Sequence, residues 1–337
     1  MTVRAFGPGR VNLIGEHTDY NNGLCLPFAI DLGVTVTASD GPAGRLAVHA
    51  RDLDEEDEFD LGRPEPAEGW RAFARGVAAE LGPPLRGAVL DVRGTVPHGS
   101  GLSSSAALEV ALALALLTHS GREEPDRREL ARLCSRVENR WVGAQTGLLD
   151  QLASLFGAPG HAIRLDLRDL AIAPVPLELG AWRLVTVDSR ARHRHASSGY
   201  NERRAECERA CALLGIASLR DATDRDLERL PDPLDRRVRH VLEENARVDA
   251  AVAALERGEL AELGALLDAS HASLRDLYEA SVPEVEETVE RLRRAGAAGA
   301  RMVGGGFGGN VLALLPPAAA PPEGAVVVAP GPAARLL

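Results

Sequence analysis

The chain has 337 residues, 45% of them hydrophobic, and a formal net charge of -11. An acidic surface repels phosphate backbones, which argues against a nucleic-acid partner. All 38 basic residues counted as Lys or Arg are arginines. The lack of lysine excludes every mechanism that needs one, and so removes Walker-A P-loop enzymes, protein kinases of the usual plan, Schiff-base enzymes and pyridoxal phosphate enzymes.

The spacing of apolar and breaker residues predicts strands at the start of the chain and mainly helices after residue 200. The predicted strands cover 3–7, 10–15, 32–39, 44–50, 87–97, 161–170 and 182–189, flank a glycine loop at 304–309 and end with 325–329. The predicted helices cover 68–82 and 103–121, begin again at Pro125, and then cover 200–214, 234–257, 259–271 and 283–295. A Pro/Ala-rich composition predicts a linker at 316–325.

A chain of this length suggests two domains, and the Pro-containing stretch before residue 180 predicts a boundary near 178, giving domains 1–178 and 179–337. Cys207 and Cys211 lie one helical turn apart and could contact a metal together, although two small residues on a helix is the simpler interpretation. The longest apolar stretch, ALEVALALALL, is too short to cross a bilayer, and no signal-type segment starts the chain. We expect a soluble monomer in the reducing cytoplasm.

The stretch GRVNLIGEHTDYNNG begins as an apolar strand and then turns polar. In an extended chain, Arg10 and Asn12 share one face. The loop that follows adds the carboxylates of Glu16 and Asp19 and the imidazole of His17. Such a density of acceptors suits a polyhydroxylated ligand, because each sugar hydroxyl can donate a hydrogen bond. A solvated turn closed by Asn and Gly is the alternative.

The stretch PHGSGLSSSAALEVA contains two glycines followed by three serines at the start of a predicted helix. Gly99 and Gly101 allow a close backbone approach to a ligand, and a helix N-terminus attracts anions. The hydroxyls of Ser103, Ser104 and Ser105 can bind phosphate or ligate Mg²⁺. An ordinary capped helix is the alternative, but a cap needs only one serine, so phosphate binding is favoured.

The stretch GGGFGG contains a formal GxGxxG pattern at Gly304, Gly306 and Gly309. A strand rather than a helix is predicted after it, and no acidic residue follows about 20 positions later, which argues against a dinucleotide site. A close approach to a ligand or to the first glycine loop is favoured. The alternative is a glycine-rich hairpin with Phe307 packed inside.

The stretch VENRWVGAQTGLLDQ contains two acids in apolar surroundings. Glu138 interrupts an amphipathic helix beside its apolar stripe. Asp150 follows a glycine and two leucines, which makes this carboxylate a candidate general base. For each acid, a place on the surface is the alternative.

These stretches together resemble the galactokinase family of the GHMP small-molecule kinase superfamily. GRVNLIGEHTDYNNG is similar to the galactokinase signature nearly residue for residue, GSGLSSSAALEVA to the superfamily's phosphate-binding loop, and MVGGGFGGNVLAL to its third motif. The resemblance extends over nearly all of residues 5–315. The sequence departs from the usual family pattern in having GLLDQ for GIMDQ, Asn310 for Cys or Ala, and short segments before the first strand and after residue 315.

The resemblance implies a two-domain α/β fold, with an S5-like N-terminal domain, a ferredoxin-like C-terminal domain and the active site between them. It implies transfer of a phosphoryl group from MgATP to the C1 hydroxyl of α-D-galactose, the first step of galactose metabolism by the Leloir route. The roles that it implies are a base or hydroxyl-orienting acid (Asp150), a charge-stabilising cation (Arg10), sugar ligands (Glu16, His17, Thr18, Asp19, Tyr200), a phosphate loop (Gly99, Ser100, Gly101, Leu102, Ser103, Ser104, Ser105) and Mg²⁺ ligands (Ser105 and Glu138, with Ser104 as the alternative hydroxyl).

Two other functions are compatible with the same motifs. One is a related kinase that acts on N-acetylgalactosamine, galacturonate or arabinose, and a panel of substrates distinguishes it. The other is a galactose sensor without catalytic activity. Sensors tend to lose residues of the phosphate loop, whereas GLSSSAA is intact here and both Asp150 and Arg10 are present.

Overall fold

The computed structural model describes residues 2–97, 101–191 and 196–337, whose strands and helices alternate along the chain. In this part of the chain the strands are β1 (Val3–Asn12), β2 (Leu24–Cys25), β3 (Pro27–Asp40), β4 (Arg45–Ala50), β5 (Glu55–Asp60), β6 (Ala88–Gly94), β7 (His161–Asp166), β8 (Ala171–Pro176), β9 (Arg183–Asp188), β10 (Gly299–Met302), β11 (Asn310–Leu315), β12 (Val326–Val328) and β13 (Arg335–Leu336).

The helices of the described residues lie where apolar side chains recur at helical spacing. They are α1 (Trp70–Leu81), α2 (Ser104–His119), α3 (Arg127–Val137), α4 (Leu149–Phe156), α5 (Ala196–Leu214), α6 (Asp224–Leu227), α7 (Leu234–Glu256), α8 (Leu260–Asp276) and α9 (Pro283–Arg294), with short turns η1 (Asp19–Asn21), η2 (Glu138–Val142) and η3 (Leu219–Asp221). None of the helices in this part of the chain is both long and apolar enough to cross a membrane.

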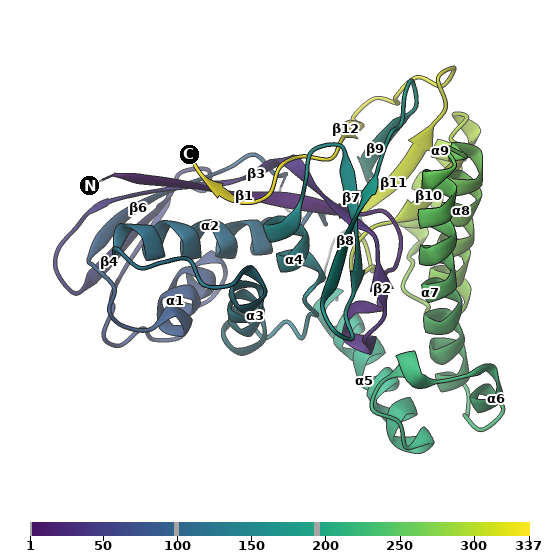
Figure 1. Cartoon of the computed structure of the whole chain (residues 1–337), viewed down its shortest axis with the longest axis horizontal. Helices are drawn as coiled ribbons and strands as arrows, with labels where there is room; N and C mark the ends of the chain where they lie inside the picture. The colour runs from purple at the N-terminus through teal and green to yellow at the C-terminus, as the bar shows by residue number, and fades with distance from the viewer. Residues whose placement is uncertain (1, 98–100, 192–195) are drawn as a thin grey trace.

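The strands form three sheets in the described residues, and each has helices against it (Figure 1). A six-stranded sheet, in the order β13-β1-β3-β6-β4-β5, has α2 and α4 packed on β1 and β3, with α1 and α3 outside them. A four-stranded sheet, in the order β10-β11-β9-β12, has α8 and α9 against it. The third sheet, β2-β7-β8, connects the two halves, because α7 packs on both of its edge strands.

The first strand is longer than the sequence predicts. Residues 3–7 and 10–15 were expected as two strands, but β1 is continuous and has a register shift between Pro8 and Arg10. The glycines on either side of Pro8 allow α2 to approach the strand: a Cβ on Gly7 would lie 2.1 Å from the Ala107 carbonyl oxygen. This close packing brings the start of α2 beside Arg10, whose backbone N–H donates to the Leu102 carbonyl at 3.0 Å.

The strands β5 and β8 are among those that the sequence does not predict. β5 is mostly charged and lies at the edge of the six-stranded sheet, where polar side chains remain in solvent. β8 contains Pro174 and Pro176, which suggest a separating loop, but β8 is an edge strand, where a missing N–H costs no ladder hydrogen bond. The domain boundary near residue 178 stays a prediction, and β13 returns past it into the N-terminal sheet.

A hydrophobic core extends across the junction of the two halves. Leu13 and Leu26 from the N-terminal part pack in one cluster with Val248, Leu263 and Leu312 from the C-terminal part. All five are buried. Burial of such side chains stabilises by roughly 1.5–3 kcal/mol each, so this core holds the polar loop after β1 firmly against the C-terminal half.

Candidate active site

A cavity of about 140 Å³ lies where the polar loop after β1 meets α4, α5 and the loop between β10 and β11. It is lined by residues from segments far apart in the sequence: Arg10, Glu16, His17, Asp19, Thr146, Gly147, Leu149, Asp150, Tyr200, Gly304 and Gly305. The structure therefore brings together both predicted catalytic residues and four of the five predicted sugar ligands. Thr18 is not among them, because its buried hydroxyl donates to the backbone carbonyls of Gly15 (2.9 Å) and Leu24 (2.7 Å).

An ion pair between Arg10 and Asp150 forms one wall of this cavity. Arg10 Nε and Nη2 each lie 2.6 Å from Asp150 Oδ1, and Arg10 Nη1 donates to the Gly101 carbonyl at 2.6 Å. The hydroxyl of Ser103 donates to the other oxygen of Asp150. Burial on its own lowers the pKa of Arg10, but the charges of Asp150, Glu16 and Asp19 and the hydrogen bond to Asp150 together outweigh burial and raise that pKa above its ordinary value. The guanidinium therefore stays charged at every physiological pH.

Both carboxylate oxygens of Glu16 interact with other groups of the protein. Its Oε2 accepts from Asn12 Nδ2 at 2.8 Å, and its Oε1 accepts from the backbone N–H of Gly304 at 2.8 Å. Arg301 Nη2 lies 3.2 Å from the same Oε1. This buried carboxylate thus joins the loop after β1 to the glycine loop between β10 and β11, a connection that the sequence does not predict.

Asp19 lies in the tightest part of the cavity wall. A Cβ on Gly147 would lie 2.0 Å from Asp19 Oδ2, so only glycine leaves room for the carboxylate there. Burial, together with the nearby charge of Asp150, raises the pKa of Asp19 to about 7. The ordinary value for Asp is 3.8, so the folded protein holds a proton that the unfolded chain has already released.

This raised pKa predicts a stability cost at high pH. Between pH 4 and pH 7 the folded state binds more protons than the unfolded state, so stability falls as the pH rises. We expect Asp19→Asn, which cannot ionise, to be more stable than the parent at pH 8 by about 1–3 kcal/mol and to lose this advantage near pH 4. Thermal unfolding from pH 4 to 8 measures the difference, with the exposed Glu323→Gln as the control. A difference in Tm that does not change with pH would contradict the assignment.

Glu138 lies in a π-helical turn that follows α3. Its carboxylate is buried and accepts hydrogen bonds from Ser105, Thr146 and Gln151. Burial raises the pKa of Glu138 above its ordinary value. The structure therefore brings the two predicted metal ligands, Ser105 and Glu138, into contact, and Thr146 links them to the cavity. The sequence indicates that Glu138 interrupts a helix, and in the structure α3 changes to this π-helical turn at Glu138.

The predicted phosphate loop is only partly described, because Gly99 and Ser100 lie outside the described residues. Gly101 and Leu102 contribute backbone carbonyls that accept from Arg10. Ser103 has a left-handed backbone (φ 63°) and directs its hydroxyl to Asp150, a partner that the sequence does not predict. α2 begins at Ser104.

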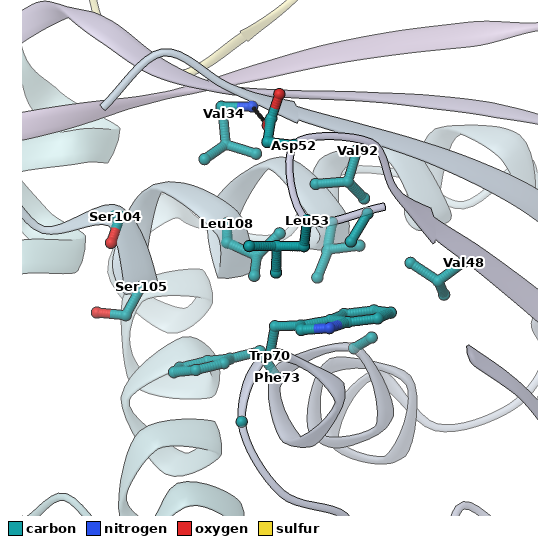
Figure 2. A pocket seen from close by; sticks show the side chains of 15 residues that line it. Val34, Val48, Asp52, Leu53, Trp70, Phe73, Val92, Ser104, Ser105 and Leu108 are labelled. Atoms are coloured by element: carbon teal, nitrogen blue, oxygen red, sulfur yellow. Dashed lines mark hydrogen bonds between the residues drawn. The ribbon is translucent and has the colours of Figure 1, made fainter. Parts of the chain in front are cut away.

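A second, larger cavity of about 380 Å³ opens beside the start of α2 (Figure 2). Trp70 and Phe73 of α1 form one side of it, and Leu53 and Leu108 lie opposite them. Ser104 and Ser105 lie at its edge. This cavity is not predicted from the sequence, because aromatic residues spaced three apart on an amphipathic helix are typical of an ordinary core.

The glycine loop between β10 and β11 closes a hairpin, as one interpretation of the sequence predicted. It also approaches the first glycine loop closely, as the other interpretation predicted: a Cβ on Gly101 would lie 3.3 Å from the Val303 carbonyl oxygen. Phe307 of this loop packs against Gly199 of α5, and the ring of Tyr200 packs over Gly305. These contacts hold the start of α5 against the loop and place Tyr200 at the cavity.

Models of three protein families match the chain. They are GHMP kinases N terminal domain at residues 70–158, Galactokinase galactose-binding signature at residues 2–40, and GHMP kinases C terminal at residues 251–326. The second match covers the loop that forms the small cavity. The first covers both the start of α2 and the segment that carries Glu138 and Asp150.

Several curated galactokinases are similar to the chain over most of its length. The protein from Thermotoga neapolitana is 44% identical over 316 residues, which are 93% of this chain and 89% of that one. The protein from Mycobacterium tuberculosis (strain ATCC 25618 / H37Rv) is 46% identical over 326 residues, 94% and 90% of the two chains. That from Streptomyces coelicolor is 46% identical over 325 residues, 91% and 83% of the two chains.

Solved structures agree with this similarity. Galactokinase of Lactococcus lactis, crystallised with galactose, superposes with a TM-score of 0.92 at 33% identity and covers 100% of this chain and 95% of its own. Mevalonate kinase of Methanococcus jannaschii, at 18% identity and a TM-score of 0.64, covers 94% of this chain and 90% of its own and shares the fold alone. The predicted two-domain GHMP kinase fold is confirmed, and the chain belongs to the galactokinase family.

Proposed function

We propose that the protein is an ATP-dependent kinase that phosphorylates the C1 hydroxyl of α-D-galactose. The observation that carries this proposal is the Arg10–Asp150 pair, which lines the small cavity and is hydrogen-bonded to Ser103, the residue before Ser104 and Ser105 at the edge of the large cavity. The small cavity suits one monosaccharide, because most of the residues that line it have polar side chains. The large apolar cavity suits the base of a nucleotide, with the helix N-terminus available for its phosphates.

The acids and tyrosine of the small cavity are the proposed sugar ligands. Asp19, when ionised, accepts hydrogen bonds from sugar hydroxyls, and Tyr200 adds a hydroxyl from the C-terminal half. Glu16 lines the same cavity, although its main partners are Asn12 and Gly304. Glu16 therefore holds the cavity wall in place and also contacts the bound sugar.

Asp150 and Arg10 are the proposed catalytic residues. Asp150 takes or orients the C1 proton, and its position is set by Arg10 on one oxygen and Ser103 on the other. Arg10 balances the charge of Asp150 and of the phosphoryl group in transfer. Phosphoryl transfer depends mainly on positioning and charge stabilisation, so a rigid buried ion pair supplies what the reaction requires.

Ser105 and Glu138 fit a Mg²⁺ ion bound together with the nucleotide. Both offer oxygen atoms, which Mg²⁺ prefers, and they already contact one another. No group of three or more His, Cys, Asp or Glu among the described residues could hold a metal by itself. Phosphate oxygens of the nucleotide would therefore complete the ligand set, and the ion would neutralise their charge.

Replacing the carboxylate of Glu138 tests this assignment. We expect Glu138→Gln to raise the Mg²⁺ concentration needed for half-maximal rate by roughly 10–100-fold, because a neutral amide is a poorer ligand for a hard cation. A Mg²⁺ titration at saturating galactose and ATP measures it, with the exposed Glu178→Gln, after the end of β8, as the control. An unchanged titration curve would show that Glu138 is not a metal ligand.

The protein is further proposed to work as a monomer in the cytoplasm. Its four cysteines are all free, which suits a reducing compartment. Size-exclusion chromatography with light scattering tests the monomeric state, and a mass near twice the 35.7 kDa of one chain would contradict it.

A coupled ADP-release assay tests the function itself. Galactose should be phosphorylated much faster than glucose, N-acetylgalactosamine, galacturonate, arabinose or mevalonate. A faster rate with one of the other sugars would identify a related kinase instead. Galactose binding in calorimetry without any ADP release would identify a sensor.

A further inference from the structure

A chain of hydrogen bonds runs away from the sugar cavity behind His17. His17 Nδ1 lies 2.8 Å from the Tyr20 hydroxyl, which lies 2.8 Å from the Tyr278 hydroxyl. The Tyr278 hydroxyl lies 3.1 Å from Cys207 Sγ. Asn21 Nδ2 in turn lies 3.6 Å from that sulfur. The chain joins the loop after β1 to α5 and to the segment between α8 and α9.

The direction of these hydrogen bonds follows from their two ends. Asn21 Nδ2 also donates to the His17 backbone carbonyl at 2.9 Å, and a carbonyl only accepts, so the amide nitrogen is the atom that faces Cys207. The sulfur therefore accepts from Asn21, but a thiol sulfur can accept more than one hydrogen bond, so the direction of the Cys207–Tyr278 contact is set at the other end of the chain, at His17.

In the favoured arrangement, each hydroxyl donates its hydrogen bond to the next residue on the side of the cavity. The Tyr278 hydroxyl donates to the Tyr20 oxygen, and the Tyr20 hydroxyl donates to His17 Nδ1. The contact at His17 sets this direction, because a phenol is a better donor than an imidazole N–H and an imidazole nitrogen is a better acceptor than a phenol oxygen. Each hydroxyl has one proton, so once Tyr20 donates to His17, the Tyr278 hydroxyl donates to Tyr20 and the Cys207 thiol donates to Tyr278. His17 Nδ1 is consequently the ring nitrogen without a proton.

The surroundings of His17 hold its ring in a single position. Its backbone is left-handed (φ 61°), a conformation that is uncommon for residues other than glycine, although His, Asn and Asp adopt it more often than the rest. The ring of Tyr278 packs against it with centroids 4.6 Å apart, and His240 packs on Tyr278 at 4.4 Å. Tyr200 lies 5.3 Å from His17 by the same measure.

His17 is neutral at physiological pH and so carries one N–H. Burial, with help from His240 and Arg203, lowers the pKa of His17 to about 3. Its Nε2 is buried and has no hydrogen-bond partner of good geometry among the described residues, although the Gly305 backbone lies close enough to the ring to raise the pKa of His17. His17 lines the sugar cavity, so a ligand oxygen is the available partner for Nε2.

We propose that Tyr20 and Tyr278 are positioning residues that fix His17 as the tautomer protonated on Nε2, and that this N–H donates to an oxygen of the bound sugar. The identity of the ligand rests on the proposed function. The cavity then combines two kinds of recognition: Asp19 accepts from sugar hydroxyls, whereas His17 donates to a sugar oxygen. A sugar without that oxygen leaves a buried donor unpaired, which is the costly kind of mismatch.

The tautomer can be observed directly and without activity. The protein is labelled with ¹⁵N-histidine, and two-bond ¹H–¹⁵N correlation spectra are recorded from pH 6 to 8 without ligand. The signal of His17, among nine histidines, is identified by its loss in His17→Gln. We expect an unprotonated Nδ1 and a protonated Nε2 throughout, and a shift toward a mixture of tautomers in Tyr20→Phe. A protonated Nδ1 in the parent, or an unchanged pattern in Tyr20→Phe, would overturn the proposal.

The contribution to sugar binding is measured separately with Tyr278→Phe, which keeps the packed ring and removes only the hydroxyl. We expect galactose affinity in calorimetry to fall by roughly 2–10-fold, with kcat and ATP affinity unchanged, since one neutral hydrogen bond is weakened. Cys211→Ala, one helical turn beyond Cys207 and outside the chain, is the matched control, and thermal unfolding verifies that both variants fold.

The two experiments also separate this proposal from the function on which it rests. If galactose affinity in Tyr278→Phe equals that of the parent, the donor role of His17 is overturned. If the parent shows the expected tautomer but neither binds nor phosphorylates galactose, the proposed function fails, while the fixing of the tautomer by Tyr20 and Tyr278 is supported.

Discussion

Asp150→Asn is expected to lower kcat by roughly 10²–10⁴-fold while galactose affinity stays close to that of the parent. The amide keeps the size of the carboxylate, and its oxygen can still accept from Arg10 while its nitrogen faces the Ser103 hydroxyl, which can reverse its role. The variant loses only the negative charge and the ability to accept the C1 proton. Binding and chemistry are therefore expected to separate.

Steady-state kinetics together with calorimetry measure both quantities. The matched control is Asp249→Asn, which disrupts another Arg–Asp pair (Arg164 to Asp249, 2.9 Å) far more exposed than the catalytic one. That variant should retain the activity of the parent. If Asp150→Asn turns over at nearly the rate of the parent, Asp150 is a structural acid that anchors Arg10, and the base assignment is wrong.

Asp19→Ala is expected to raise the galactose KM by roughly ten- to 150-fold and to leave nucleotide affinity unchanged. The carboxylate lines the small cavity, and loss of a hydrogen bond to a charged group costs about 1.5–3 kcal/mol. The sugar hydroxyl that it binds is left without a partner in a buried site. The large cavity, by contrast, is lined by other residues and does not include Asp19.

Galactose KM from initial rates and ATP affinity from calorimetry without sugar test this expectation. Because burial raises the pKa of Asp19 to about 7, the effect should be larger at pH 8, where the carboxylate of the parent is ionised, than at pH 6. If nucleotide affinity collapses and galactose affinity survives, the loop after β1 serves the nucleotide, and the assignment of the two cavities must be exchanged.

Much of the candidate site could be predicted because its residues occur in short, local patterns. The alternation of Arg10 and Asn12 placed both on one face of β1, and both are buried there. The serines after two glycines predicted the start of α2, and the hairpin around the glycine loop followed from strands on both sides of it. Period and capping chemistry decide such features within a few residues, so they can be read from the sequence.

Partners from distant segments could not be predicted in this way. Glu16 bonds to Gly304 across 288 positions, and Tyr20 meets Tyr278 across 258. The Ser103 hydroxyl, predicted to bind phosphate, donates to Asp150 instead. The Thr18 hydroxyl, predicted to bind the sugar, donates to a backbone carbonyl. No local pattern encodes these choices, because each depends on which other polar groups the fold brings within hydrogen-bonding distance.

The amino-acid sequence by itself thus determined the kind of chemistry: an acidic protein without lysine, with a polar loop for a sugar, a serine-rich helix start for phosphates and an acid for the reacting hydroxyl. The tertiary structure decided which of these groups meet. It also decided that Trp70 and Phe73, at the edge of the core, line a cavity, that β8 is a strand despite its prolines, and that β13 returns to the first sheet. The physical reason is that residue type sets what a side chain can donate or accept, whereas burial and long-range packing set its partner, its pKa and, for His17, the nitrogen that carries the proton.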